Sequence, residues 1–115
     1  MLFIYYPKCT TCQKAKKYLD DNKIKYDERN IKTDNPTITE LREWYQKSNL
    51  PLKKFFNTSG LKYKELNLKE GLLHLSEEEQ LQLLSTDGML IKRPILVYDN
   101  EIILGYKEEN YKNIR

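Results

Sequence analysis

The chain has little of what most metal and nucleotide sites require. It contains two cysteines, Cys9 and Cys12, and one histidine, His74. A structural zinc ion usually takes about four Cys or His ligands, so these three residues disfavour a metal site. The four glycines are scattered and form no phosphate-binding or dinucleotide-binding loop. We therefore expect no bound metal and no bound organic cofactor.

Long apolar runs and a large charge of one sign are also missing. No stretch approaches the ~20 apolar residues of a membrane-spanning helix, and residues 1–6 lack the basic leader of a signal peptide. The 20 basic and 17 acidic side chains leave a net charge of only +3, which makes no case for nucleic-acid binding. We expect a cytoplasmic monomer that contacts neither membrane nor nucleic acid directly.

The amino-terminal pattern predicts an α/β fold. Residues 2–6 form an apolar run typical of a buried strand, the residues after Cys12 have helical periodicity, and residues 24–31 alternate as a second strand does. A strand, a helix and a strand within about thirty residues predict a right-handed βαβ unit with parallel strands.

The rest of the chain predicts a small mixed sheet completed by a hairpin. Residues 94–98 and 101–104 flank the two-residue turn Asp99–Asn100 and predict antiparallel strands. A final helix is expected over residues 107–115. We assign residues 1–115 to a single domain with a helical insertion at about 35–88.

Two capping boxes mark helices inside that insertion. Thr37 with Glu40, and Ser76 with Glu79, have the spacing of a hydroxyl N-cap and a carboxylate that bonds back to it. His74 lies between apolar residues before the second of these helices. We expect it to be a partly buried structural histidine rather than a catalytic base.

The cysteine pair carries the strongest chemical signal, in the sequence PKCTTCQK. Three interpretations are open: metal ligands, small buried side chains, or a redox pair. A CxxC next to a βαβ pattern favours the redox pair. At a helix start, the dipole together with Lys8 and Lys14 would favour the Cys9 thiolate. Cys12 lies one turn later and would act as the resolving thiol.

The segment KRPIL supplies a second candidate element. Arg93 could hold an anion or stabilise the Cys9 thiolate, and Pro94 could shape the substrate edge. The alternative is an ordinary proline at a strand start beside a solvated arginine. Thr10 and Thr11, between the cysteines, join Arg93 and Pro94 as expected substrate-binding, anion-binding or thiolate-stabilising residues.

Taken in order, YPKCTTCQKAKKYL, RNI, RPIL and LGY resemble the ArsC/Spx family over nearly the whole chain. The resemblance implies a thioredoxin-like core with a helical insertion, in which the proline matched by Pro94 is usually cis and faces the cysteines. The family includes glutaredoxin-linked arsenate reductases and Spx-type regulators that bind bacterial RNA polymerase.

The two branches imply different chemistry. In the arsenate reductases one cysteine, matched by Cys9, attacks the arsenic oxyanion, and three arginines hold that anion. Only Arg93 matches; Asn57 and Tyr106 stand where the other two would fall. Each missing arginine removes charge-assisted hydrogen bonds of roughly 1.5–3 kcal/mol, which disfavours arsenate as the substrate. The Spx-type regulators carry a CxxC as an oxidation switch.

These observations predict a thiol–disulfide oxidoreductase with Cys9 as nucleophile and Cys12 as resolving thiol. The expected electron donors and partners are glutathione, glutaredoxin or thioredoxin. The main alternative is an Spx-like redox sensor that binds the RNA polymerase α subunit, and a weaker one is a true arsenate reductase.

Overall fold

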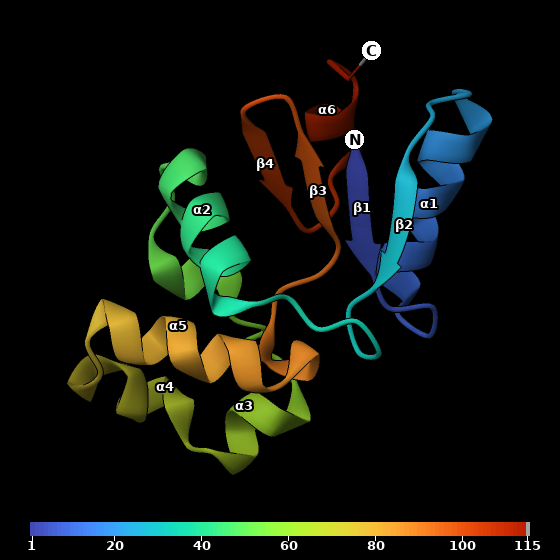
Figure 1. The fold of residues 1–115 in the computed structure, drawn as a ribbon. Coiled ribbons are helices and arrows are strands. Elements are labelled where there is room, and N and C mark those ends of the chain that lie inside the picture. The colour runs from blue at the N-terminus through green and yellow to red at the C-terminus, as the bar shows by residue number, and fades with distance from the viewer. Residues whose placement is uncertain (115) are drawn as a thin grey trace.

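In the computed structural model, which describes residues 1–114, the core is a four-stranded mixed sheet in the order β2-β1-β3-β4 (Figure 1). The strand β1 pairs with β2 in parallel and with β3 antiparallel, and β3 pairs with β4 antiparallel. The βαβ start and the hairpin end are therefore confirmed. The strands are β1 (Leu2–Tyr5), β2 (Asp27–Asn30), β3 (Ile95–Tyr98) and β4 (Glu101–Leu104).

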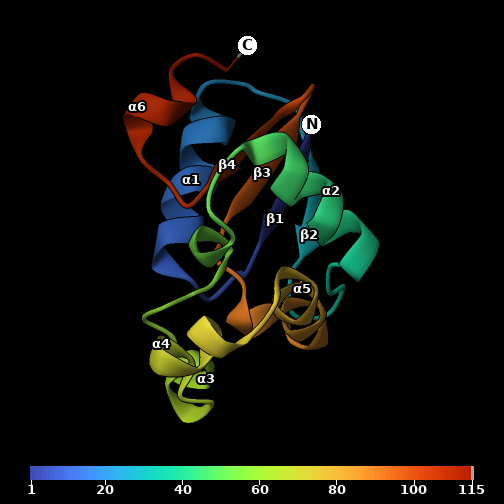
Figure 2. The same cartoon turned by 90° about the vertical axis from the view of Figure 1, so that its left-hand side faces the viewer.

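Helices cover both faces of the sheet and extend past one end of it. In Figures 1 and 2, α1 and α6 lie on one face and α2 on the other, while α3, α4 and α5 gather beyond the carboxyl ends of β1 and β2. The α-helices are α1 (Thr10–Asp21), α2 (Ile38–Ser48), α3 (Leu61–Glu65), α4 (Leu68–Gly71), α5 (Glu77–Thr86) and α6 (Glu108–Tyr111), and the 3-10 helices are η1 (Leu52–Phe55), η2 (Leu72–His74) and η3 (Gly88–Leu90).

Strand alternation divides the core into two clusters. Phe3 and Leu96 face α1 together with Leu19 and Tyr111, whereas Ile4 packs among the side chains of α2, α5 and the insertion. Adjacent strand residues point to opposite faces, so each short strand contributes to both clusters. This arrangement fixes α1, and the cysteines at its start, against the sheet.

Both predicted capping boxes are present. The hydroxyls of Thr37 and Ser76 accept hydrogen bonds from the N–H groups of Glu40 and Glu79, and both glutamates accept in return from the N-cap amides. The helices α2 and α5 therefore start where the sequence indicates, because the free N–H groups of a helix start are satisfied locally.

The second strand is shorter than predicted. Ile24 and Tyr26 pack partly buried against the α1-side cluster, as their alternation suggests, but strand pairing begins only at Asp27. The Ile24 amide instead bonds to the carbonyl of Leu19 at the end of α1. Since β1 starts at Leu2, which pairs with Asp27, earlier residues have no strand partner.

The expectation of a partly buried His74 is wrong, because the side chain is exposed. It lies in η2, where a 3-10 helix has three residues per turn. Leu72 and Leu75 share the inward side, so Leu73 and His74 are turned towards solvent.

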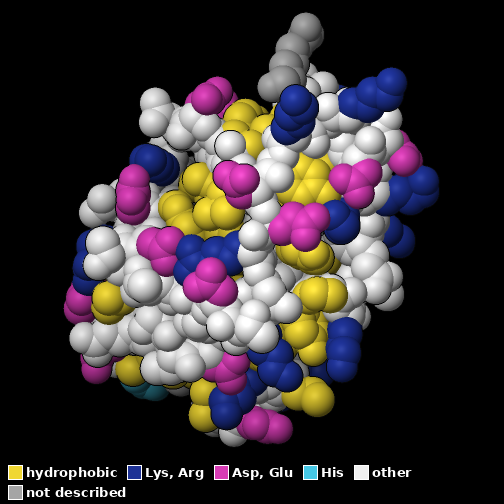
Figure 3. All heavy atoms as spheres, turned by 45° about the vertical axis from the view of Figure 1, so that its right-hand side comes forward, with side chains coloured by type: hydrophobic (Ala, Val, Ile, Leu, Met, Phe, Trp, Pro, Cys, Tyr) yellow, Lys and Arg dark blue, Asp and Glu magenta, His cyan; other side chains and the backbone are white. Residues whose placement is uncertain are grey.

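The carboxyl-terminal helix is also shorter than predicted. The expected helix over 107–115 is reduced to α6, and Arg115 lies outside the described residues. No helix among residues 1–114 is long and apolar enough to cross a membrane. The face shown in Figure 3 mixes Lys and Arg with Asp and Glu side chains, so this face carries no extended patch of one charge.

Candidate active site

The two cysteines occupy the amino-terminal end of α1. Cys9 is the N-cap residue and is partly exposed, while Cys12 in the first turn is completely buried. The loop before them is held by the Cys9 amide, which donates to the Tyr6 carbonyl at 3.0 Å, and by the Gln13 side chain, which donates to the Pro7 carbonyl at 2.8 Å. The first turn carries no acidic side chain, so its positive end is not neutralised.

The surroundings favour the ionised form of Cys9. Partial burial by itself would raise its pKa, but the amides of Cys12 and Thr11, the Cys12 thiol and the charge of Arg93 together hold the pKa below its ordinary value. The Cys9 side chain makes no capping hydrogen bond in the thiol form, but the free amides of a helix start favour a thiolate at this position. Cys9 is thus partly accessible and has a lowered pKa.

Cys12 has the opposite character. Burial raises its pKa to about 12, and the hydrogen bond and negative charge of Cys9 add to that effect, against opposing contributions from the Tyr6 amide and Arg93. Of the two thiols, Cys9 therefore ionises first and Cys12 remains protonated beside it.

Arg93 faces this pair from the strand side. Its guanidinium lies over the Tyr6 ring, with Cζ 5.5 Å from the ring centroid, and one terminal nitrogen points at the carbonyls of Met89 and Ile91 at 3.4 Å each. The partly buried side chain is therefore packed in place rather than free in solvent.

Pro94 is buried and follows a cis peptide bond with Arg93. Its carbonyl accepts a hydrogen bond from Gly105 at 2.8 Å. This contact joins the RPIL segment (93–96) with the LGY segment (104–106).

One segment of the insertion pairs with the segment that leads to Arg93. Phe56 forms an isolated antiparallel bridge with Ile91, the Asn57 amide bonds to the Leu90 carbonyl, and the Lys92 amide bonds to the Phe55 carbonyl. The segment that carries Asn57 therefore runs alongside the segment that leads to Arg93. Tyr106, by contrast, packs against Tyr18 and Tyr111 in the α1-side cluster.

The structure brings together most of the predicted residues. Thr10 and Thr11 are exposed in the first turn of α1, next to Cys9, and Arg93 acts electrostatically on both cysteines. Lys8 and Lys14 are exposed and are not among the main influences on either thiol. His74 belongs to the insertion and is likewise not among the main influences on either thiol.

Sequence reasoning did not separate Tyr6 from Tyr5. Tyr6 contacts the Arg93 guanidinium and supplies backbone groups to both cysteines, whereas the hydroxyl of Tyr5 donates to Glu28 at 3.0 Å. Alternation could have indicated the difference, since neighbouring side chains of an extended segment face opposite sides, and Tyr5 and Tyr6 pack against different clusters.

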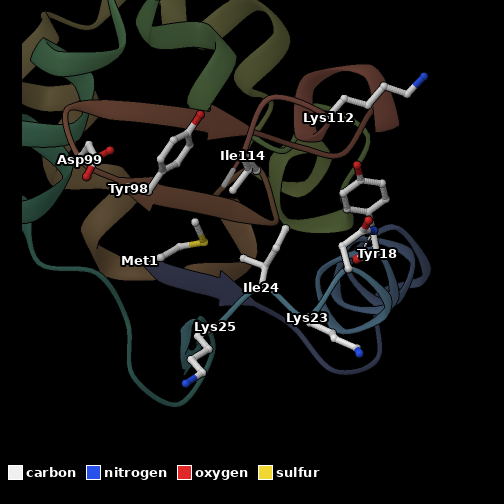
Figure 4. Close-up of a pocket in the computed structure, with 10 residues that line it drawn as sticks. Met1, Tyr18, Lys23, Ile24, Lys25, Tyr98, Asp99, Lys112 and Ile114 are labelled. Carbon is white, nitrogen blue, oxygen red and sulfur yellow. Dashed lines mark hydrogen bonds between the residues drawn. The ribbon is translucent and has the colours of Figure 1, made fainter.

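Two hollows open on the surface. One is a groove of about 1270 Å³ that includes Thr11 and follows β4. The other, of about 510 Å³, lies at the opposite end of β1 and α1 (Figure 4). Figure 4 shows Met1 and Ile24 near its centre, with the amines of Lys23, Lys25 and Lys112 turned away from them.

No group of three or more potential metal ligands lies close together within residues 1–114. The side chains that converge at the start of α1 are two thiols, an arginine and hydroxyls, which suit thiol and anion chemistry.

Comparison with known proteins agrees with this geometry. The sequence model of the ArsC family matches residues 4–114. The uncharacterised protein YusI of Bacillus subtilis is 52% identical over 112 residues, which cover 97% of this chain and 95% of YusI. The global transcriptional regulator Spx 1 of Bacillus cereus is 30% identical over 106 residues, covering 92% and 79% of the two chains.

A solved structure extends the likeness to the whole fold. A protein of Bacteroides fragilis described as related to the ArsC family superposes with a TM-score of 0.96 at 51% identity, covering 99% of this chain and 96% of the other. The predicted α/β fold with a thioredoxin-like core is thereby confirmed. The chain belongs to the ArsC family.

Proposed function

We propose that the protein is a thiol–disulfide oxidoreductase in which Cys9 attacks the substrate and Cys12 resolves the intermediate. The observation that carries the proposal is the contrast between the two thiols. Cys9 is partly exposed with a lowered pKa, and the neighbouring Cys12 is buried with a pKa raised to about 12.

In the first step, the Cys9 thiolate attacks one sulfur of a substrate disulfide. The bond between Cys9 and that sulfur forms as the substrate's disulfide bond breaks, and the departing thiolate takes a proton from water. The first-turn amides and Arg93 keep Cys9 ionised for this attack.

The second step depends on a change that the first step produces. While Cys9 is ionised, its charge and hydrogen bond help to keep Cys12 protonated. Once Cys9 is in a mixed disulfide, that influence is gone and the pKa of Cys12 falls, although burial still holds it high. Cys12 then loses its proton to solvent and attacks the Cys9 sulfur, and the second substrate thiolate departs.

The balance of the two steps is one disulfide reduced and one formed. Two electrons pass from the cysteine pair to the substrate, which leaves a Cys9–Cys12 disulfide. Two further electrons from a dithiol donor, or from two glutathione molecules, restore the thiols. Glutaredoxin and thioredoxin are dithiol donors of the required class.

The test is the pH dependence of cysteine alkylation, followed residue by residue, in the wild type and in Cys12→Ser. We expect Cys9 to react first, with a pKa below the ~8.5 of a free thiol. In Cys12→Ser, a Cys9 pKa that stays lowered supports Cys9 as the nucleophile. A mixed disulfide that accumulates after exposure to substrate supports Cys12 as the resolving thiol. Faster modification of Cys12 than of Cys9, or a Cys9 pKa equal to that of a free thiol, contradicts this assignment.

A second candidate function follows from the similarity to Spx 1. In that reading the same pair acts as a redox switch that controls binding to the RNA polymerase α subunit, without turnover. Pull-down of the purified α subunit under reducing and oxidising conditions tests it. Binding that depends on redox state supports a regulator, and no binding in either state rejects it.

Arsenate reduction is the weakest candidate. Asn57 and Tyr106 would have to replace two arginines, and Tyr106 packs among aromatic rings. The test is arsenate-dependent oxidation of the reductant that is abolished in Cys9→Ser.

A further inference from the structure

A surface groove connects the cysteine loop with the outer edge of the sheet. It has a volume of about 1270 Å³, and its lining includes Thr11, one of the two residues between the cysteines. Both Ile102 and Ile103 line it, although they belong to the clusters on opposite faces of the sheet. The groove therefore follows the edge of β4 rather than one face, and Figure 2 shows this strand between α6 and α2.

The edge offers unpaired backbone groups. β4 is the last strand of the sheet, and the Gly105 amide bonds to the Pro94 carbonyl of the neighbouring chain segment. In an antiparallel pair, hydrogen-bonded and non-hydrogen-bonded positions alternate. With Leu104 opposite Ile95 and Ile102 opposite Val97, the amides and carbonyls of Leu104 and Ile102 point outward.

The groove is positively charged. Its charged side chains are four lysines, at 53, 54, 92 and 107, and two glutamates, Glu101 and Glu109. Within residues 1–114 none of these lysines forms an ion pair, while Glu101 accepts a hydrogen bond from the Tyr98 hydroxyl. Four unpaired cations against two anions favour an acidic occupant.

We propose that this groove binds an extended acidic segment of a protein substrate, which adds to β4 as a further strand and leads its cysteine to Cys9. The proposal rests on the proposed function and names its substrate class. Outward backbone groups supply affinity for any extended chain, and the lysines select its charge. The volume exceeds the ~300–1000 Å³ of small-molecule pockets, which favours a polypeptide segment.

A second copy of this chain is a poorer occupant. Pairing two β4 edges would bring the lysines of one groove towards those of the other, and like charges at an interface are unfavourable. Self-association at this edge is therefore an outcome that the test must be able to report.

The probe is a fluorescent peptide in which valine and glutamate alternate around a central serine. Serine in place of cysteine makes it unable to react, so binding is measured without turnover. We expect fluorescence anisotropy to report binding that weakens as salt increases. A peptide with glutamine in place of glutamate should bind at least about tenfold more weakly.

The protein variant is Lys53→Glu with Lys54→Glu, because both side chains are exposed on the groove wall. The matched control is Lys64→Glu with Lys69→Glu, which changes the net charge equally at exposed positions outside the groove. We expect about a tenfold loss of affinity in the first variant and no change in the second. Equal losses in both, or none in either, overturn the proposal.

Strand addition makes a separate prediction about the peptide backbone. N-methylation at alternate residues on the edge that faces β4 should abolish binding, and methylation on the opposite edge should leave it intact. The amide resonances of Ile102 and Leu104 should shift on binding. Strand addition is contradicted if both methylated peptides bind equally well. It is also contradicted if the protein dimerises with increasing concentration and the peptide does not disturb the dimer.

Failure of this proposal can be told apart from failure of the proposed function. Reduction of the small neutral disulfide bis(2-hydroxyethyl) disulfide tests the cysteines alone. Turnover of that compound without peptide binding rejects only the groove proposal, and peptide binding without any turnover rejects only the oxidoreductase.

Discussion

The guanidinium of Arg93 lies over the ring of Tyr6, with Cζ 5.5 Å from the ring centroid. Tyr6 belongs to the loop that leads to Cys9, and its carbonyl accepts the Cys9 amide. Tyr6 therefore contacts both the loop that carries Cys9 and the Arg93 guanidinium, whose charge lowers the Cys9 pKa.

Replacing Arg93 tests that electrostatic contribution. In Arg93→Gln we expect the pKa of Cys9 to rise, since a nearby opposite charge favours the ionised form and that charge is removed. The measurement is the pH dependence of Cys9 alkylation at low salt. Arg42→Gln, which removes an arginine that pairs with Glu78 elsewhere, should leave the pKa unchanged. An equal pKa in wild type and Arg93→Gln would mean that the helix amides and the Cys12 thiol lower the Cys9 pKa without Arg93.

The raised pKa of Cys12 predicts a loss of stability in alkali. Because burial raises this pKa from 9.0 to about 12, the native state keeps a proton that the unfolded state releases between these values. Stability is fully present below pH 9 and falls above it, by up to ~1.4 kcal/mol per pH unit.

Denaturant unfolding under reducing conditions, over a series of pH values above 9, measures this loss. The free energy of unfolding of Cys12→Ala should fall less steeply with pH than that of the wild type, since the titrating group is gone. Cys9→Ala is the matched control and should keep most of the slope, because burial is the largest cause of the Cys12 shift. Parallel curves for all three proteins would contradict the assignment.

The ion pair between Arg29 and Glu40 predicts sensitivity to acid. Two guanidinium nitrogens donate to the Glu40 carboxylate at 2.6 and 2.9 Å, and these bonds lower its pKa to about 2 from 4.5. Stability from this group is present above pH 4.5 and is lost as the pH falls towards 2. Glu40→Gln should cost about 1–2 kcal/mol at neutral pH, after allowance for partial exposure.

Thermal or denaturant unfolding is measured at neutral and acidic pH. The difference in free energy of unfolding between wild type and Glu40→Gln should disappear in acid. Glu43→Gln is the control, because Glu43 pairs with Lys47 on an exposed helix face. That pair should contribute at most ~0.5 kcal/mol. A pH-independent gap for Glu40→Gln would indicate loss of helix capping instead.

Two glycines should respond oppositely to alanine. A Cβ on Gly88 would overlap the Ile31 carbonyl oxygen and lie 2.8 Å from its carbon, whereas a Cβ on Gly71 would meet only the Leu68 side chain at 4.0 Å. Gly88→Ala should therefore destabilise by more than ~2 kcal/mol through overpacking against backbone. Gly71→Ala, in a helix, should be neutral or stabilising by up to ~1 kcal/mol. The free energy of unfolding of each variant measures this, and similar values for both would contradict the packing described.

The local features of this protein were determined by its sequence. Apolar runs, turn residues and capping boxes act over a few residues, so the βαβ start, the Asp99–Asn100 hairpin and the starts of α2 and α5 could be predicted. The placement of Cys9 before a helix followed from the same local rules.

What depended on long-range contact could not be predicted. The start of β2 was decided by where β1 begins, and the exposure of His74 by which side of η2 meets the core. The bridge between Phe56 and Ile91 and the groove along β4 arise from segments far apart in the chain. The raised pKa of Cys12 likewise required tertiary structure, because burial is its largest cause. The lowered pKa of Cys9 followed in part from the helix start that the sequence indicated, and only the contribution of Arg93 depended on a distant segment.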